Sequence, residues 1–335
     1  PMDVSPGAFS PDGSLYQLEY ACRAADRGQL AVGVEAKGGV VLACPRAGSP
    51  PFAESSARDS VSKEAHALES LQRFDGSVAG QKLCALGPSI GCASGGLLPD
   101  SRMLVDYGRT MVANHWFTYG EAPSLEAVAQ ALSDALLSFS NHPRPKGEKP
   151  PLQMARPFGA SLLLAAAGSP CGEVGALFHL SPTGAQQRFR AKAIGAGSKE
   201  AEEVLSRALF ESLLPEADAT KAASAAADQG QGDHASAWLA AELAEVGRFE
   251  APSIAVATRV AVLAVVQASR ARALECRGGA ALGDEPAREG VSDVSEAEAW
   301  SVEVAVASEA GFQVLTPIQI SELLARAGSP LTGTS

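Results

Sequence analysis

The stretch "QLAVGVEAKGGVVLAC", residues 29–44, decides which fold the chain can adopt. Its two mostly apolar runs, residues 30–35 and 40–44, are rich in valine and predict two β-strands. The turn between them, Lys37-Gly38-Gly39, predicts a hairpin, because glycine accepts the backbone angles that a tight turn needs. Both strands carry apolar residues on both faces, which is typical of a sheet that is covered on each side. The fold must therefore place further layers above and below this hairpin.

Outward from the hairpin, runs of strands alternate with pairs of helices. Apolar runs predict further strands at residues 82–85, 89–93, 158–167, 174–181, 185–196 and 300–308. Helical spacing predicts helices at residues 100–117, 124–139, 199–214 and 253–274, and a last helix that begins at Thr316. Helices in sequential pairs do not fit a parallel βαβ sheet. The order predicts an α+β fold in which two antiparallel sheets stack between outer helices, a four-layer α-β-β-α sandwich.

Four segments do not fit this pattern, because they are polar or rich in proline, lysine, glycine or acidic residues. We interpret them as surface insertions in a single domain that spans residues 1–335. They are residues 55–80, 141–153, 215–252 and 277–299.

Composition excludes several classes of function. The formal net charge is −11 and no run of lysine and arginine is present, which argues against nucleic-acid binding. The six cysteines have no zinc spacing and the five histidines converge on no common element, so neither a metal nor another cofactor is expected. No leader pattern is present, and the most apolar stretch, residues 254–266, is too short to span a bilayer. We expect a reduced, intracellular, soluble protein without a membrane partner.

Residues 86–96, "LGPSIGCASGG", contain a G-x-S-x-G pattern around Ser89. In serine hydrolases this pattern forms a nucleophile elbow, with a strand before the serine and a helix directly after it. Here three of the next seven residues are glycines, which make a poor first helical turn. We interpret the segment as a strand, residues 89–93, that ends in a Gly-Gly turn, with a helix from about Asp100.

One alternative function stays open at this point. In it the chain is an autonomous hydrolase that uses Ser89 together with an acid such as Asp106 and a histidine such as His115 or His179.

The N-terminal stretch "FSPDGSLYQLEYA", residues 9–21, closely resembles the signature that opens the α-type subunits of the 20S proteasome. The stretch "GCASGGLLPDSRMLVDYGR", residues 91–109, is similar to a strand-turn-helix of the same subunits. The stretches "NHWFTY", residues 114–119, and "RPFG", residues 156–159, narrow the resemblance to the alpha type-5 group. The family has the N-terminal nucleophile hydrolase fold, which is the four-layer sandwich that the order of elements predicts.

The resemblance also bears on catalysis. The β-type subunits of the proteasome share this fold and cut peptides with an N-terminal threonine, aided by an acidic residue and a lysine. When "AVGV", residues 31–34, is aligned with their first strand, the threonine position falls at Gln29, the acidic position at Pro45 and the lysine position at Lys82. Gln29 is no nucleophile and Pro45 has no carboxylate. The resemblance thus implies a non-catalytic subunit, not an enzyme.

As a member of that family, the chain is expected to assemble with other α subunits into a seven-membered hetero-ring that docks on the β ring. This ring gates the entry of unfolded protein substrates in ubiquitin-dependent protein degradation, in the cytoplasm and nucleus. Regulatory-particle ATPases insert their C-terminal tails between neighbouring α subunits. The resemblance implies that Lys82 meets the carboxylate of such a tail, in a groove that Gly13, Glu19 and Leu97 line.

The resemblance further implies a gate tail at residues 1–8. The family tail reads Tyr-Asp-Arg where this sequence has Met2-Asp3-Val4, so only Asp3 is kept. Pro11 and Tyr20 match the proline and the second tyrosine that cluster with that tail in the open gate. We hypothesise that this tail contributes little to a stable open gate, or that the native N-terminus is longer.

Residues 9–28 predict a turn followed by an amphipathic helix with one apolar face. In the family this helix lies across the end of the sandwich that β-type subunits leave open for catalysis.

Overall fold

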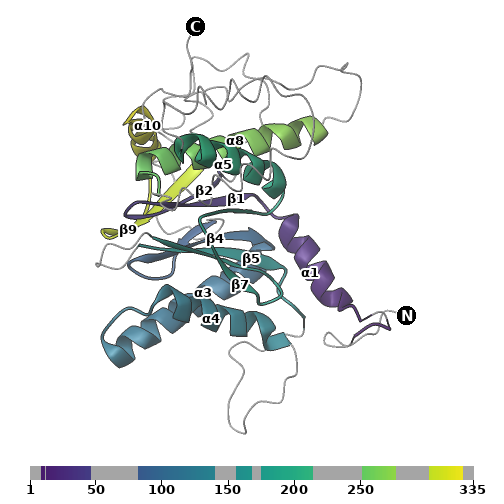
Figure 1. Ribbon diagram of the computed structural model, residues 1–335. Helices are drawn as coiled ribbons and strands as arrows, with labels where there is room; N and C mark the ends of the chain where they lie inside the picture. The colour runs from purple at the N-terminus through teal and green to yellow at the C-terminus, as the bar shows by residue number, and fades with distance from the viewer. Residues whose placement is uncertain are drawn as a thin grey trace, which may run out of the picture.

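Two five-stranded antiparallel sheets lie face to face at the centre of the protein (Figure 1). The computed structural model describes residues 9–11, 13–46, 82–139, 156–167, 175–213, 251–276 and 302–326. The first sheet has the strand order β10 (Gly311–Val314), β9 (Val302–Ser308), β2 (Gly39–Pro45), β1 (Ala31–Ala36), β8 (Ala191–Ile194). The second sheet has the order β3 (Leu83–Ala85), β4 (Ile90–Gly96), β5 (Ala160–Ala166), β6 (Ala176–Leu180), β7 (Gln186–Phe189).

The β1–β2 hairpin lies inside the first sheet, as its composition predicts. Ala36 pairs with Gly39 across the turn, and all six residues of β1 are buried. Side chains of these strands alternate between two apolar layers. Val32 and Val41 face the helices, whereas Leu42 and Cys44 face the second sheet.

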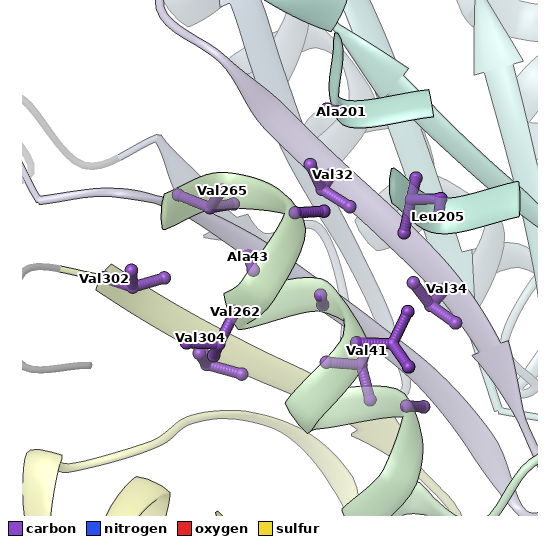
Figure 2. Close-up of a cluster of buried hydrophobic side chains, with 14 of the residues drawn as sticks. Val32, Val34, Val41, Ala43, Ala201, Leu205, Val262, Val265, Val302 and Val304 are labelled. Atoms are coloured by element: carbon purple, nitrogen blue, oxygen red, sulfur yellow. The ribbon is translucent and has the colours of Figure 1, made fainter. Parts of the chain in front are cut away.

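Helices cover the outer face of each sheet. The first sheet is covered by α5 (Ser198–Leu213), α8 (Ile254–Cys276) and α10 (Pro317–Arg326). The second sheet is covered by α3 (Leu98–Tyr119) and α4 (Leu125–Leu136). Figure 2 shows how valines of β1, β2 and β9 pack against Val262 and Val265 of α8 and Leu205 of α5. The predicted four-layer α-β-β-α sandwich is therefore confirmed.

One described helix, α8, has the length and composition of a membrane-spanning helix over Ile254–Arg272. The helix continues past residue 266, so the prediction that this stretch is too short was wrong about its length. In the structure α8 packs on the first sheet, and Ala261, Val262 and Val265 are buried there. A core helix of a soluble protein passes the same test of length and composition, so this match is weak evidence for a membrane span.

The predicted turn at the end of β4 and the predicted start of α3 were both wrong in detail. Gly95 and Gly96 do not form a turn, because they continue β4 and pair with Ser161 and Ala160 of β5. In addition, α3 begins at Leu98 rather than near Asp100.

The strand predicted at residues 185–196 is two strands that belong to different sheets. β7 pairs with β6 and β8 pairs with β1, and the chain crosses between the sheets at Arg190. There the backbone N–H of Glu35 donates to the carbonyl of Arg190 at 2.7 Å. A strand with no predicted counterpart, β10, extends the first sheet beyond β9.

The gate tail, residues 1–8, and the four predicted insertions lie outside the described residues, except for residues 251 and 252 just before α8. Those predictions stay predictions.

Candidate functional site

One helix lies across an end of the two-sheet sandwich. α1 (Tyr16–Asp26) follows a turn in which the backbone N–H of Gly13 donates to the carbonyl of Ser10. The helix rests on the end of β4 and the start of β5, with Ala21 and Ala25 buried (Figure 1). We call this end, where β1 and β5 begin and β2 and β4 end, the α1 end of the sandwich.

Three glycines allow α1 to approach the sheet backbone closely. A Cβ atom on Gly28 would overlap the backbone of Gly96, and a Cβ atom on Gly96 would overlap the carbonyl of Gly159. The same atom on Gly96 would lie 2.9 Å from the Cα atom of Ala160 and 3.0 Å from that of Ala25. Gly96 also has φ +101°, which L side chains rarely adopt. Backbone packs directly on backbone at Gly28 and Gly96, and the side chains of Leu97 and Ala24 pack on Gly159, so α1 lies close against the strand ends here.

The two positions aligned with a catalytic threonine and its acidic partner meet at this end. Gln29, just before β1, donates from Nε2 to the carbonyl of Pro45, the last residue of β2, at 2.6 Å. In that alignment an amide side chain takes the place of the nucleophile, and its Nε2 is hydrogen-bonded. No carboxylate is available from Pro45.

Lys82 lies at the same end, directly before β3. Its carbonyl accepts a hydrogen bond from the N–H of Ser94 at 3.1 Å, and the residue is only 9% exposed. Burial lowers the pKa of Lys82, and the thiol of Cys44 lies close enough to influence it. Within the described ranges, no hydrogen bond or ion pair involves the Lys82 ammonium. A mostly buried cation that has no counter-ion among the described residues favours an anionic ligand.

The other predicted groove residues lie on or beside α1. Glu19, in the first turn of α1, pairs with Arg23 at 3.8 Å, and Leu97, between β4 and α3, is 44% exposed. Gly13 has φ +80° and open space around its Cα atom. The backbone of β4 connects this region to Lys82. The N–H of Ser94 is hydrogen-bonded to the carbonyl of Lys82, and Leu97 follows Ser94 by three residues.

Of the predicted gate residues, Asp3 lies outside the described residues. Pro11 is exposed in the turn before α1, and Tyr20 is half exposed on α1, with the Arg23 guanidinium 5.9 Å from its ring centroid. The structure does not place Asp3 relative to either residue.

A buried carboxylate that the sequence reasoning missed lies behind Leu97. Asp100, in the first turn of α3, is 2% exposed and accepts two hydrogen bonds from Arg156, Nη1 to Oδ2 at 2.7 Å and Nη2 to Oδ1 at 2.8 Å. It also accepts one from the N–H of Gly159 at 2.8 Å. Burial alone would raise the pKa of Asp100, but these hydrogen bonds outweigh it and lower the pKa. The only sequence signal was "RPFG", which was used for resemblance and not for chemistry.

The residues of the alternative hydrolase site do not come together. Ser89 lies in a bend before β4, not within a strand as predicted. Asp106 pairs with Arg109 at 3.4 Å on α3, and Nδ1 of His115 hydrogen-bonds to the carbonyl of Glu121 at 3.1 Å on the same outer helix layer.

His179 lies on the other side of the second sheet from α3. It pairs with Leu163, whose side chain belongs to the apolar layer between the sheets. Burial, with a smaller contribution from Lys192, lowers the pKa of His179 to about 4. A sheet therefore separates the two candidate histidines, and among the described residues neither is hydrogen-bonded to Ser89.

No group of three or more His, Cys, Asp or Glu side chains within the described residues has the geometry of a metal site. Cys22, Cys44 and Cys92 are free thiols.

Comparisons with known proteins agree with this geometry. The family model of proteasome subunits matches residues 75–238, and the model of the N-terminal signature of A-type proteasome subunits matches residues 2–24. The chain is 35% identical over 206 residues to the alpha type-5 proteasome subunit of Drosophila melanogaster, which covers 61% of this chain and 72% of that protein. It is 34% identical over 204 residues to the probable alpha type-5 subunit of Schizosaccharomyces pombe, covering 61% and 70%. An archaeal relative, the alpha-type proteasome subunit of Saccharolobus islandicus, is 30% identical over 208 residues, covering 62% and 72%.

Proposed function

Because the chain belongs to the α-type subunits of the proteasome, we propose that it is a non-catalytic member of the seven-membered outer ring of the 20S particle. In this role it assembles with other α subunits, docks on the β ring and gates the entry of unfolded protein substrates. It also forms part of the groove that receives the C-terminal tails of regulatory-particle ATPases.

The α1 end of the sandwich supports the non-catalytic role. Peptide cleavage by an N-terminal threonine needs a hydroxyl, a free amine on the same residue and space for a substrate carbonyl. Here Gln29 supplies a carboxamide whose Nε2 is already bonded to Pro45. The close contact of Gly28, Gly96 and Gly159 leaves no room between α1 and the strand ends. The closed end is the observation on which the proposal rests.

Lys82 supports the docking role. An ammonium that is largely buried and unpaired, among the residues described, gains a charge-assisted hydrogen bond when a carboxylate arrives. The single Lys82 ammonium needs only one anionic group as its partner. The terminal carboxylate of an extended tail supplies one such group. When several tails bind around one ring, the overall affinity exceeds that of any single tail, because the later contacts form within one complex.

Exposed aromatic side chains support assembly into a larger particle. Phe117, near the end of α3, is 92% exposed, and Trp116 and Tyr119 beside it are more than half exposed. A cluster of large apolar side chains on the surface is typical of a protein interface. We propose that neighbouring subunits cover it in the assembled particle, which acts in ubiquitin-dependent degradation in the cytoplasm and nucleus.

For the gate, we propose that the tail of this subunit contributes little to a stable open state. The proposal rests on the sequence, in which Asp3 is kept but the family tyrosine and arginine are replaced by Met2 and Val4. A longer native N-terminus that contains Tyr-Asp-Arg, detected by intact-mass measurement, would contradict it.

Binding of a tail peptide to the assembled particle tests the docking role. The probe is a synthetic peptide with the last eight residues of a regulatory ATPase, prepared with a free carboxylate and, separately, with a C-terminal amide. We expect Lys82→Ala to weaken binding of the free peptide by about 10- to 100-fold, the effect of losing one charge-assisted hydrogen bond. Lys192→Ala is the control, because Lys192 is paired with Glu202 at 2.6 Å between β8 and α5.

The two changes form a cycle that identifies the contact. If Lys82 meets the carboxylate, the amide peptide binds as weakly as the free peptide binds Lys82→Ala, and combining both changes has no further effect. Equal loss of affinity in Lys82→Ala for both peptides would contradict the docking role. Labelling of Ser89 by a fluorophosphonate probe on the isolated chain would instead support the hydrolase alternative.

A further inference from the structure

A buried carboxylate joins two segments that lie far apart in the sequence. Asp100 of α3 holds the guanidinium of Arg156 through two hydrogen bonds and the N–H of Gly159 through a third. Arg156 also donates from Nη1 to the carbonyl of Pro157 at 3.0 Å. We call this set of contacts the Asp100 clamp. It fixes residues 156–159, which lead into β5, to the first turn of α3.

The clamp is connected to Leu97 through Gly159. The N–H of Leu97 donates to the carbonyl of Gly159 at 2.9 Å, so the residue held by Asp100 in turn holds Leu97. A Cβ atom on Gly159 would lie 3.0 Å from Cδ1 of Leu97 and 3.2 Å from Cβ of Ala24 in α1. Gly159 is therefore packed between Leu97 on one side and the last turns of α1 on the other.

The clamp is also linked to Lys82 through the sheet. Gly96 pairs with Ala160 at the start of β5, and two residues earlier Ser94 is bonded to the carbonyl of Lys82. The relative positions of Lys82, Leu97 and α1 therefore depend on where the 156–159 segment is held. Asp100, Arg156 and Pro157 have no part in the function proposed above.

We propose that Asp100 and Arg156 are positioning residues for the tail-docking groove: they hold Leu97 and the end of α1 in the geometry that receives a carboxylate-terminated peptide. This inference rests on the proposed docking function. A groove that is held in shape before the ligand arrives binds more tightly, because less ordering has to accompany binding. Charge-assisted, two-point contacts between arginine and a carboxylate are well suited to fix such a geometry.

The burial of the two partners allows the clamp to be opened gently. Asp100 is almost completely buried, whereas the Arg156 side chain is 51% exposed. Replacement of Arg156 leaves no large cavity in the core, and Asp100 keeps its hydrogen bond from Gly159. Arg156→Gln also leaves a buried carboxylate without its cation, so the exchange of α8 is needed to separate lost positioning from general destabilisation, and Arg156→Lys keeps the positive charge.

The experiment uses the full chain in the assembled particle, with Arg156→Gln, Arg156→Lys and the control Lys192→Gln. Lys192→Gln also removes a cation from an ion pair with a carboxylate, but between β8 and α5. Amide hydrogen exchange is measured over α1 and α8, and binding is measured with the free-carboxylate tail peptide. We expect Arg156→Gln to raise exchange in the last turns of α1 by about tenfold, with α8 unchanged. We expect it to weaken peptide binding by about fivefold.

Each outcome either supports or contradicts the positioning role of Asp100 and Arg156. Arg156→Lys keeps the charge but not the two-point contact, so it should restore part of both effects, while Lys192→Gln should show neither. Unchanged exchange in α1 with Arg156→Gln would overturn the inference, as would an equal rise in α1 and α8, which indicates general destabilisation. If the peptide does not bind the unmodified particle, the docking function itself fails, and the exchange of α1 alone then decides whether the clamp positions that helix.

Discussion

Replacement of Gly96 by alanine measures how tightly α1 is packed on the strand ends. The new Cβ atom would overlap the carbonyl of Gly159 and lie 2.9 Å from the Cα atom of Ala160, so backbone atoms must move. Overpacking of this kind costs about 1–3 kcal/mol. The φ angle of +101° adds a further cost of about 1–2 kcal/mol, because an L side chain is strained there. We therefore expect Gly96→Ala to lower the free energy of unfolding by about 2–5 kcal/mol.

Gly38 provides the matched control. It lies in the β1–β2 turn with φ +83°, and a Cβ atom there would have nothing within 4 Å. Gly38→Ala therefore carries only the backbone cost of about 1–2 kcal/mol. Equilibrium unfolding of the isolated chain in urea, followed by far-ultraviolet circular dichroism, gives both free energies. The difference between the two variants, about 1–3 kcal/mol, is the contribution of close packing at the α1 end.

Equal destabilisation by the two variants would refute this reasoning. It would mean that α1 can move away from the strand ends at little energetic cost. Close packing would then not be what closes this end of the sandwich. A second sign is expected in hydrogen exchange, where Gly96→Ala should expose the amides of α1 and Gly38→Ala should not.

Three further predictions concern the core and its ionisable groups. Asp100→Asn should lower the free energy of unfolding by about 1–3 kcal/mol. Because folding lowers the pKa of Asp100, this loss of stability should be complete above about pH 4. It should disappear as the pH falls through the folded-state pKa. Thermal melts of the unmodified protein and of Asp100→Asn between pH 2 and pH 7 measure this difference. A constant difference across that range would contradict the role given to the Asp100 carboxylate. Iodoacetamide at pH 7 should label the half-buried Cys22 before Cys44, whose burial raises the pKa of its thiol, as mass spectrometry of the digested protein would record. In urea unfolding, Leu164→Ala in the fully buried β5 should cost about 2–5 kcal/mol, whereas Ile318→Ala, 70% exposed on α10, should cost less than about 0.5 kcal/mol; similar costs would contradict the burial pattern.

The sequence by itself determined the elements whose signals are local. The β1–β2 hairpin follows from two apolar runs around Gly38 and Gly39, and the start of α10 follows from its capping pattern. In the structure the N–H of Gln319 donates to the Thr316 hydroxyl at 3.4 Å, and the Thr316 N–H donates to the Gln319 side chain at 2.9 Å. Such patterns are read correctly because the residues that form the element are also the ones that specify it.

The resemblance correctly indicated the family. Its alignment placed Gln29 at the threonine position and Pro45 at the acidic position; a hydrogen bond joins these two residues in the structure, and their assignment to catalytic positions stays a prediction. The same reasoning did not reveal the division of residues 185–196 between two sheets. A strand that crosses between sheets and a continuous strand have the same alternation of side chains, and only the pairing of β7 with β6 and of β8 with β1 separates them.

Only the tertiary structure decided how the α1 end is closed and what holds it. Asp100 and Arg156 are separated by 56 positions, and nothing within either segment predicts the other as its partner. The three glycines likewise look like turn residues in the sequence, although Gly96 belongs to a strand whose backbone carries α1. Contacts between distant segments depend on how whole layers stack, and a local pattern contains no information on that stacking.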